Sequence, residues 1–197
     1  MPGTQTAPIP FVIYKVIQAS DQLPYVERLP EKAALTVKRG TPVVLSGGFL
    51  IERGAISSVA TAIVAGVTDE DGHNLASDGT APVGGSGLTF GSVQNQPAAK
   101  NIPIGAPMAD GTLGTVVASD ENIFVGKTDA AHTVAATDLG TVVGITKDAT
   151  SGLWFVDTTI VTLATGGVVE IVEPIELGVV GGKVAFKFIR PSQQLFS

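Results

Sequence analysis

Short apolar runs, rich in β-branched and aromatic residues and separated by glycine-bearing turns, fill the chain from residue 37 onward. Each run is too short for a helix and stops at a turn signal, so the pattern predicts strands. In the clearest run, Val184, Phe186 and Phe188 fall on one face of a strand and lysines fall on the other. The expected strands are residues 42–45, 61–67, 88–93, 114–118, 123–126, 141–146, 153–159, 168–173 and 183–189. We therefore expect an all-β fold with a compact β-barrel or β-sandwich-like body.

The first 36 residues differ from the rest, because five of the twelve prolines lie there. Residues 11–17 nevertheless have the composition of a strand, and proline-containing sequence on both sides separates this strand from any hairpin partner. Unpaired backbone groups are costly once buried, so the strand must pair either with the chain's own body or with another subunit. The sequence leaves both alternatives open. It predicts an extended N-terminal arm at 1–36 and a β-rich domain at 37–197.

Two pairs of segments within the body resemble each other. Residues 65–70 (Ala-Gly-Val-Thr-Asp-Glu) resemble residues 143–148 (Val-Gly-Ile-Thr-Lys-Asp), and residues 41–48 resemble 106–111 in having an apolar step before a glycine turn. Glycine-rich β sequences produce such similarities by chance, so chance and an internal duplication both stay open. Residues 68–101 are mostly polar and turn-forming, and they predict a long exposed loop suited to contact with neighbours.

Composition and charge exclude several classes of partner. Hydrophobic residues make up 44% of the chain and charged residues 15%, and the net charge is −6. The charge is uneven, at +2 over residues 1–53, −11 over 54–182 and +3 over 183–197. An acidic middle repels nucleic acid and anionic membranes, so we expect neither as a partner. The N-terminus lacks the pattern of a signal peptide, and no apolar stretch is long enough to span a membrane, which predicts synthesis in the cytoplasm.

Candidate chemistry is sparse. The chain has no cysteine, and the phosphate-loop-like Gly126-Lys127-Thr128 lacks the required upstream glycine. The polar cluster at residues 69–74 has oxygen donors but not the order of a calcium loop, and is typical of a solvated turn. We expect His73 and His132 to be exposed loop residues and Trp154 to lie in the core. The sequence thus predicts no enzyme, no cofactor and no metal site.

The order of several short pieces resembles the capsid decoration, or cement, proteins of tailed bacteriophages. The pieces are residues 41–48 (Thr-Pro-Val-Val-Leu-Ser-Gly-Gly), 63–67, 122–126, 138–140, 151–159 and 184–188. The resemblance implies a β-rich protein on the outer surface of the virion capsid. It also implies that the protein clamps subunits of the major capsid protein and stabilises the shell, as a homotrimer or sometimes a dimer. The alternative is a β-rich phage tail, fibre or baseplate component that binds a receptor.

The arm region supplies the predicted partner-binding residues. The orphan strand is a natural donor for strand addition to a neighbour, and nearby cations are suited to acidic patches on the shell. The predicted residues are Phe11, Ile13, Tyr14, Lys15, Ile17, Arg28, Lys38 and Arg39. The high apolar content also predicts a homo-oligomer, because apolar surface needs to be covered.

Overall fold

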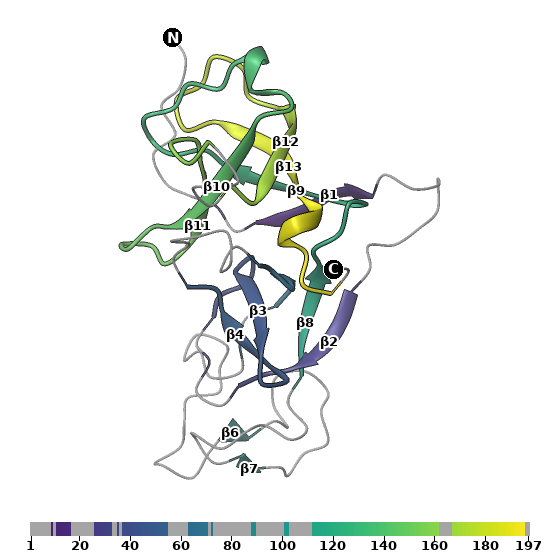
Figure 1. The fold of residues 1–197 in the computed structure, drawn as a ribbon. Coiled ribbons are helices and arrows are strands. Elements are labelled where there is room, and N and C mark those ends of the chain that lie inside the picture. Colours follow the sequence, from purple (N-terminus) through teal and green to yellow (C-terminus); the bar gives the residue numbers. More distant parts are fainter. Residues whose placement is uncertain are drawn as a thin grey trace.

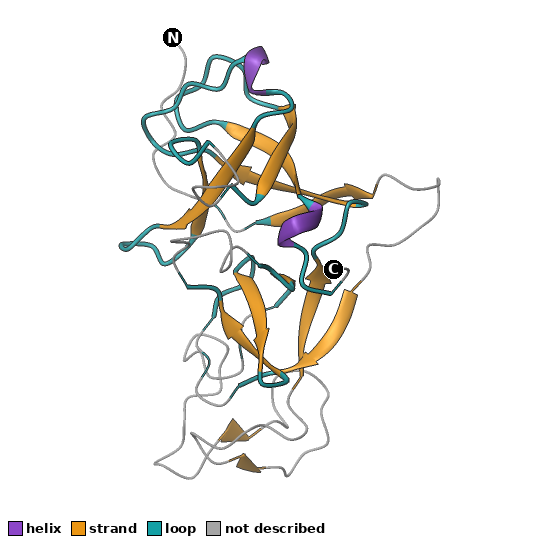
Figure 2. Ribbon diagram, viewed as in Figure 1, coloured by secondary structure: helices purple, strands orange, loops and turns teal. Residues whose placement is uncertain are grey.

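The computed structural model describes residues 9, 11–16, 26–32, 35, 37–54, 63–70, 72, 88–89, 101–102, 112–161 and 167–195. Within these residues the fold is nearly all β, as predicted. The helical elements there are two short 3-10 helices, η3 (Ala136–Asp138) and η5 (Arg190–Ser192). Figures 1 and 2 show two groups of strands, one above the other, with the small pair β6 and β7 at the far end.

All strand pairs in the sheets are antiparallel. The larger sheet contains, in spatial order, β1 (Val12–Val16), β9 (Asn122–Lys127), β13 (Lys183–Phe188), β12 (Val169–Pro174), β10 (Val142–Lys147) and β11 (Trp154–Asp157). The second sheet contains β2 (Val26–Pro30), β8 (Thr112–Val117), β5 (Gly66–Thr68), β3 (Pro42–Ser46) and β4 (Phe49–Glu52). A separate pair joins β6 (Leu88–Thr89) to β7 (Asn101–Ile102).

Each expected strand overlaps an observed one, and residues 11–17 contain β1. The sequence pattern missed β2, β4 and β7. β2 has two adjacent charged residues, Glu27 and Arg28, and ends at Pro30, so its composition favours a loop. It belongs to the second sheet through its pairing with β8, although the sequence predicted it as part of the arm. β4 follows directly after Gly47 and Gly48, whose positive φ angles of 59° and 85° make the tight turn between β3 and β4.

Each of the two large sheets contains a unit of five strands, and the two units are repeats of one another. The first repeat consists of β2, β3, β4, β5 and β8, and the second consists of β9 to β13. In both, the spatial order is the first, fifth, fourth, second and third strand along the chain. In both, the residue after the first strand forms a parallel bridge with the third strand, namely Glu31 with Leu50 and Thr128 with Val156. Each five-stranded unit therefore curls back on itself, and β1 is an added strand on β9.

The two repeats agree in register as well as in order. Pro42 pairs with Val67 in the first repeat, and Val142 pairs with Glu170 in the second. Turn hydrogen bonds repeat in the same way, because the amides of Gly40 and Gly140 donate to the carbonyls of Thr68 and Ile171, both at 2.8 Å. Four more backbone N–H to O=C hydrogen bonds occur at equivalent places. In the first repeat they run from Ala65 to Val43, Lys32 to Leu50, Gly72 to Val37 and Ala118 to Ala65. Their counterparts in the second repeat, in the same order, run from Val168 to Val143, Asp129 to Val156, Gly178 to Val134 and Ile189 to Val168.

Matching sequence underlies this agreement at two places. The motif Ala-Ala-x-Thr-Val occupies residues 33–37 and 130–134, and Gly-Thr-x-Val occupies 40–43 and 140–143. The strand registers make these segments equivalent. The similarity noted between residues 65–70 and 143–148 therefore joins segments that are not equivalent, because the first contains β5 and the second contains most of β10, which is equivalent to β3. The segment 106–108 lies outside the described residues.

The core is shared between the repeats. Its larger cluster combines side chains of β9 to β13, including Trp154 and Phe186, with Val64, Val67, Val116 and Ala118 of the first repeat. A smaller cluster around Val43, Leu50 and Leu113 fills the first repeat. The prediction that Trp154 is a core residue is confirmed, since its side chain is buried. The larger cluster thus spans both repeats, and the smaller one lies within the first repeat.

Candidate functional site

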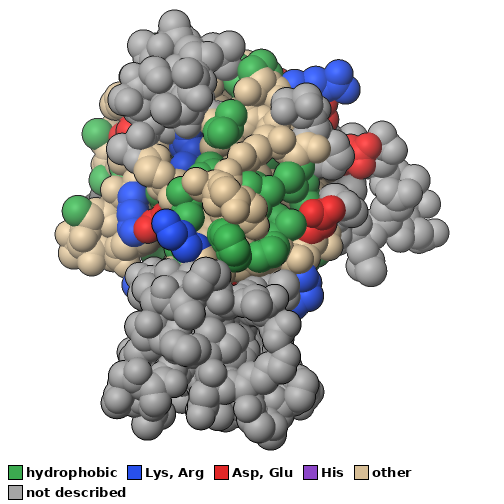
Figure 3. Space-filling model, turned by 60° about the horizontal axis from the view of Figure 1, so that its bottom comes forward, with side chains coloured by type: hydrophobic (Ala, Val, Ile, Leu, Met, Phe, Trp, Pro, Cys, Tyr) green, Lys and Arg blue, Asp and Glu red, His purple; other side chains and the backbone are tan. Residues whose placement is uncertain are grey.

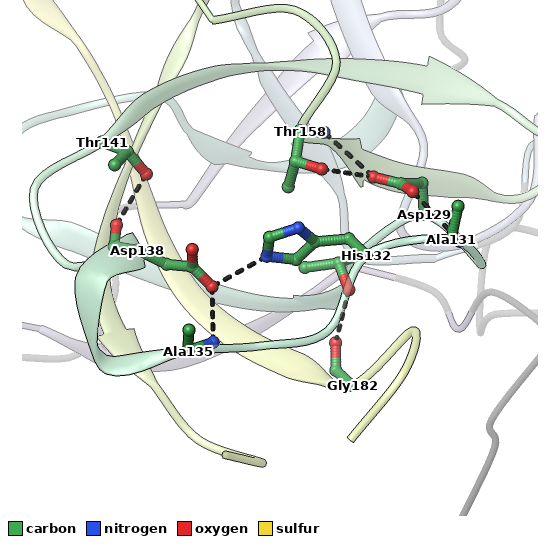
Figure 4. Close-up of polar contacts among 9 residues, drawn as sticks. Asp129, Ala131, His132, Ala135, Asp138, Thr141, Thr158 and Gly182 are labelled. Atoms are coloured by element: carbon green, nitrogen blue, oxygen red, sulfur yellow. Dashed lines mark hydrogen bonds and ion pairs between the residues drawn. The ribbon is translucent and has the colours of Figure 1, made fainter. Parts of the chain in front are cut away.

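The most prominent polar cluster of the described residues lies in the loop between β9 and β10 (Figure 4). Asp138, at the end of η3, places Oδ2 at 2.8 Å from the Nε2 atom of His132 and accepts a hydrogen bond from the Ala135 amide at 2.8 Å. Its backbone carbonyl accepts a hydrogen bond from the Thr141 hydroxyl at 2.6 Å. His132 was expected to be an exposed loop residue. It does lie in a loop, but its side chain is only 24% exposed and is held by Asp138.

Asp129 forms the second half of this cluster. Its Oδ2 atom accepts hydrogen bonds from the Thr158 hydroxyl at 2.6 Å and the Thr158 amide at 3.2 Å. Its Oδ1 atom accepts one from the Ala131 amide at 3.1 Å. Burial alone would raise the pKa of Asp129, but the hydrogen bonds from Thr158 and Ala131 outweigh it and hold the pKa below its usual range. Asp129 is therefore an anion that fixes two chain segments.

The cluster has the residue types of a catalytic site, but its hydrogen bonds are arranged as in a structural one. Catalysis by a hydroxyl nucleophile needs a base that takes its proton. Here the Thr158 hydroxyl donates to Asp129, and His132 is bonded to Asp138. The repeat explains the arrangement further, because His132 is equivalent to Leu35, which packs against the core of the first repeat. In the second repeat, the polar contact between His132 and Asp138 replaces the apolar packing of Leu35 and holds the loop.

The polar cluster at residues 69–74, predicted to be a solvated turn, is described only in part. Asp69 accepts a hydrogen bond from Arg39 at 3.3 Å, and Glu70 accepts one from Arg28 at 3.0 Å. Glu70 also accepts the Gly114 amide at 2.7 Å. Asp71, His73 and Asn74 lie outside the described residues. Among the residues that are described, no group of three or more His, Cys, Asp or Glu side chains is placed to hold a metal ion.

The structure pairs β1 with β9 of the same chain, with Val12 opposite Val125 and Val16 opposite Asn122. This is the within-chain alternative for the orphan strand. Phe11 is 1% exposed, and its ring packs edge-on against Phe186 at a centroid distance of 4.9 Å. The side chains of Ile13, Tyr14 and Lys15, and the whole of Ile17, lie outside the described part of the chain. Attachment of this strand to a partner stays a prediction.

Of the four predicted cations, Arg28, Lys38 and Arg39 have described side chains, and all three are exposed. Arg28 and Arg39 meet the neighbouring acids Glu70 and Asp69. Lys38 instead donates through Nζ to the carbonyl of Ser151 in the second repeat at 2.8 Å. On the face shown in Figure 3, cationic and anionic side chains lie beside one another next to exposed apolar groups.

Sequence reasoning missed two further features. Arg53 follows β4 and is 3% exposed. Its Nε atom donates to the Ile63 carbonyl at 3.1 Å, but Nη1 and Nη2 have no hydrogen-bond partner among the residues that the structure describes. Burial lowers the pKa of Arg53 to about 10. Leu139 and Leu177, by contrast, are 61% and 59% exposed. No sequence signal marks Arg53, but the two leucines stand in turn sequence where polar residues are usual.

Comparison with known proteins adds no name to this architecture: no family model matches the chain, and neither does any curated protein or solved structure. Within the described residues, no helix has the length and apolar character needed to cross a bilayer.

Proposed function

We propose that the chain is a structural decoration protein that binds the outer surface of a tailed-bacteriophage head and stabilises contacts between major capsid protein subunits. The sequence resemblance supports this class. The geometry supports a structural role in general, because the polar groups of the most prominent cluster hold loops together. A decoration protein needs a stiff body with complementary surfaces, and repeated weak contacts on one shell give it high avidity.

The observation that carries the proposal is the way in which the two repeats are locked together. The Gln194 side chain bonds to both the amide and the carbonyl of Leu45, at 2.7 and 2.8 Å. Glu52 of the first repeat accepts hydrogen bonds from the Trp154 ring at 3.4 Å and from Lys147 at 2.6 Å. Together with the shared core, these contacts resist motion between the repeats. A stiff double unit of this kind transmits load between the subunits that it joins.

In this proposal the protein is made in the host cytoplasm and acts on the virion as a homo-oligomer, with a trimer favoured over a dimer. Its partners are the major capsid protein and other copies of itself, and it requires no nucleic acid, membrane, cofactor or catalytic residue. Trimer over dimer rests on the resemblance alone. Closed cyclic symmetry covers apolar surface without open-ended growth.

The test is to add purified protein to tailed phage particles that lack it and to locate the added density by cryo-electron microscopy. We expect density on the outside of the head and greater resistance of the heads to heat. Heads that already carry the protein are the control and should gain no density. Density confined to tails or baseplates would favour the tail alternative, and absence of binding to any particle would contradict both.

A further inference from the structure

The outer edge of β2 differs from the equivalent edge in the second repeat. There, β9 has β1 beside it as an antiparallel strand, with Lys15 opposite Ile123. β2 is the equivalent of β9, but it is the last strand of its sheet and lies at the margin of the lower group of strands (Figure 1). Among the described strands, none pairs with its outer side until the Glu31–Leu50 bridge that follows it. One repeat therefore has an added strand where the other has an open edge.

The bridge shows which backbone groups of β2 point outward. The amide of Lys32 donates to the carbonyl of Leu50 at 3.1 Å, so the backbone groups of Lys32 face β4. Backbone hydrogen-bonding groups alternate between the two sides of a strand, so those of Val26, an even number of residues earlier, face the same way. The N–H and C=O of Val26 thus point away from β8, and no hydrogen bond joins them to another described residue. By the same count, the backbone groups of Ile123 in the second repeat face β1.

The side chains at these two equivalent positions differ in exposure. Ile123, which has β1 beside it, is 3% exposed, whereas Val26 is 42% exposed. A β-branched residue in a sheet is stabilised by its cross-strand neighbours. Val26 has Val116 of β8 as its neighbour on one side and no described strand on the other. Both the backbone and the side chain of Val26 are therefore accessible to a further strand.

The first repeat does not need a further strand to complete its own core. In the second repeat, the ring of Phe11, which precedes β1, fills the space beside Gly126, where an added Cβ would lie 2.5 Å from that ring. The equivalent of Gly126 is Leu29, whose own side chain packs against the core of the first repeat. A strand added to β2 thus needs no buried anchor. Such an edge can stay open in the free protein and accept a strand from a separate one.

We propose that the outer edge of β2 at Val26 accepts an extended segment of a neighbouring protein as an added antiparallel strand, in the way that β9 takes β1. The segment pairs through its backbone and carries an apolar residue opposite Val26, which becomes buried in the complex. The proposal deepens the proposed function and rests on it in one respect, since it assigns the segment to the capsid shell.

A second copy of this chain is a poorer source of the strand. A symmetric antiparallel pair of β2 strands centred on residue 27 or 28 would set Glu27 or Arg28 directly opposite its own copy, and like charges in that position destabilise a sheet. β1 of a second copy is held on its own β9, because Phe11 is buried and packs against Phe186. These contacts favour a segment from a different protein.

The test compares Val26→Pro with the matched control Val26→Thr. Proline removes the outward N–H and is tolerated on an edge strand, whereas threonine keeps both the N–H and the branched shape. Both variants should melt within a few degrees of the wild type. We expect Val26→Pro to bind phage particles that lack the protein at least about tenfold more weakly, and Val26→Thr to bind as the wild type does. Unchanged binding by folded Val26→Pro would overturn the acceptor edge and leave the proposed function standing.

A variant that keeps the N–H covers the case in which Val26→Pro does not fold. Val26→Lys places a charge on the edge, which natural sheets use to prevent strand addition, and it should weaken binding in the same way. Hydrogen exchange followed by mass spectrometry adds a direct readout, since the Val26 amide should exchange rapidly in the free protein and slowly on the particle. Equally rapid exchange in both states would contradict the proposal.

Failure of the proposed function is distinguishable from failure of the acceptor edge. If the wild type binds no particle, the proposed function fails, and so does the shell as the source of the strand. Sedimentation velocity then reports whether copies of the chain associate with one another. Self-association that is lost in Val26→Pro and kept in Val26→Thr would support the acceptor edge and assign the strand to a second copy. Absence of both particle binding and self-association would overturn the edge altogether.

Discussion

The two repeats hold the same backbone frame with different side chains. Equivalent turns contain Leu35 and His132, and the residues that form the closing bridges are Glu31 and Thr128. Both bridge residues are buried, although one carries a carboxyl group and the other a hydroxyl. What the repeats share is strand register, turn hydrogen bonds and a glycine with positive φ. The comparison shows that backbone pairing and turn geometry define the repeat unit, while the side chains at equivalent positions can differ in size and polarity.

The cores of the repeats differ most at one equivalent pair, Leu29 and Gly126. Leu29 packs against the core of the first repeat. At Gly126 an added Cβ would lie 2.5 Å from Cε1 of Phe11, so the Phe11 ring occupies the space that a side chain would need. The second repeat therefore takes a core side chain from outside itself, from the residue that precedes β1.

The largest effect that we expect comes from removing this borrowed side chain. Phe11→Ala should lower the free energy of unfolding by about 3–5 kcal/mol, because a fully buried ring leaves a cavity. Adding Gly126→Leu to that variant should restore part of the loss, since the first repeat fills the equivalent position with leucine. Urea unfolding followed by circular dichroism measures both. A loss below about 1 kcal/mol for Phe11→Ala would contradict the proposed equivalence of the two cores.

The same reasoning applies to deletion of residues 1–20. If β1 completes the second repeat as the structure has it, the deletion should lower the melting temperature strongly. An unchanged melt together with lost binding to heads would instead favour the arm as an attachment device.

The strands of the body could be predicted from sequence because glycine turns and apolar runs mark them locally. β2 could not, because Glu27 and Arg28 give it a polar composition, and its place in the sheet comes from pairing with β8, far along the chain. The repeat was suspected but misaligned: Gly66 stands where the second repeat has Val169, so the true partners share no residue type on these strands. The His132 cluster was missed because Asp138 meets His132, and Thr158 meets Asp129, only once the chain has folded.

A second prediction concerns a position where the repeats differ in burial. Arg53 is buried, whereas its equivalent, Thr159, is exposed. Arg53→Met should raise the free energy of unfolding by about 1–3 kcal/mol at pH 7, because it removes a buried cation that lacks full hydrogen bonding. Lys32→Gln, an exposed cation in the same repeat, is the control and should have little effect.

The difference in unfolding free energy between Arg53→Met and the wild type should depend on pH in one direction. The pKa of Arg53 is lowered to about 10 in the folded state, so above about pH 10 the unfolded chain binds more protons than the folded one. Stability of the wild type relative to Arg53→Met should therefore increase as the pH rises above about 10. A gap that stays constant from pH 7 to pH 11 would show that burial of the charge is not its cause.

A third, smaller effect tests the polar loop that only the second repeat has. Asp129→Asn should cost about 1–2 kcal/mol at pH 7, because the hydrogen bonds from Thr158 and Ala131 lose their charged acceptor. The pKa of Asp129 is depressed in the folded state, so its stabilisation is complete above its ordinary value near 4 and is lost as the pH falls through the folded value. Denaturation curves for wild type and variant should converge in acid; a gap independent of pH would exclude the charge as its source.

The smallest effect tests the equivalence of the repeats most directly. Gly40 and Gly140 have φ angles of 81° and 77°, and both donate to the strand that pairs with the one following them. Replacing either with alanine should cost about 1 kcal/mol, because a Cβ disfavours left-handed backbone. No atom lies within 4 Å of a Cβ added at Gly140, so the cost there comes from the backbone angle alone. Gly54→Ala, where φ is not positive and the space is also open, is the control and should cost nothing. Equal losses at residues 40 and 140, with none at 54, would support a shared turn; a loss at only one of them would show that the two repeats depend on this turn differently.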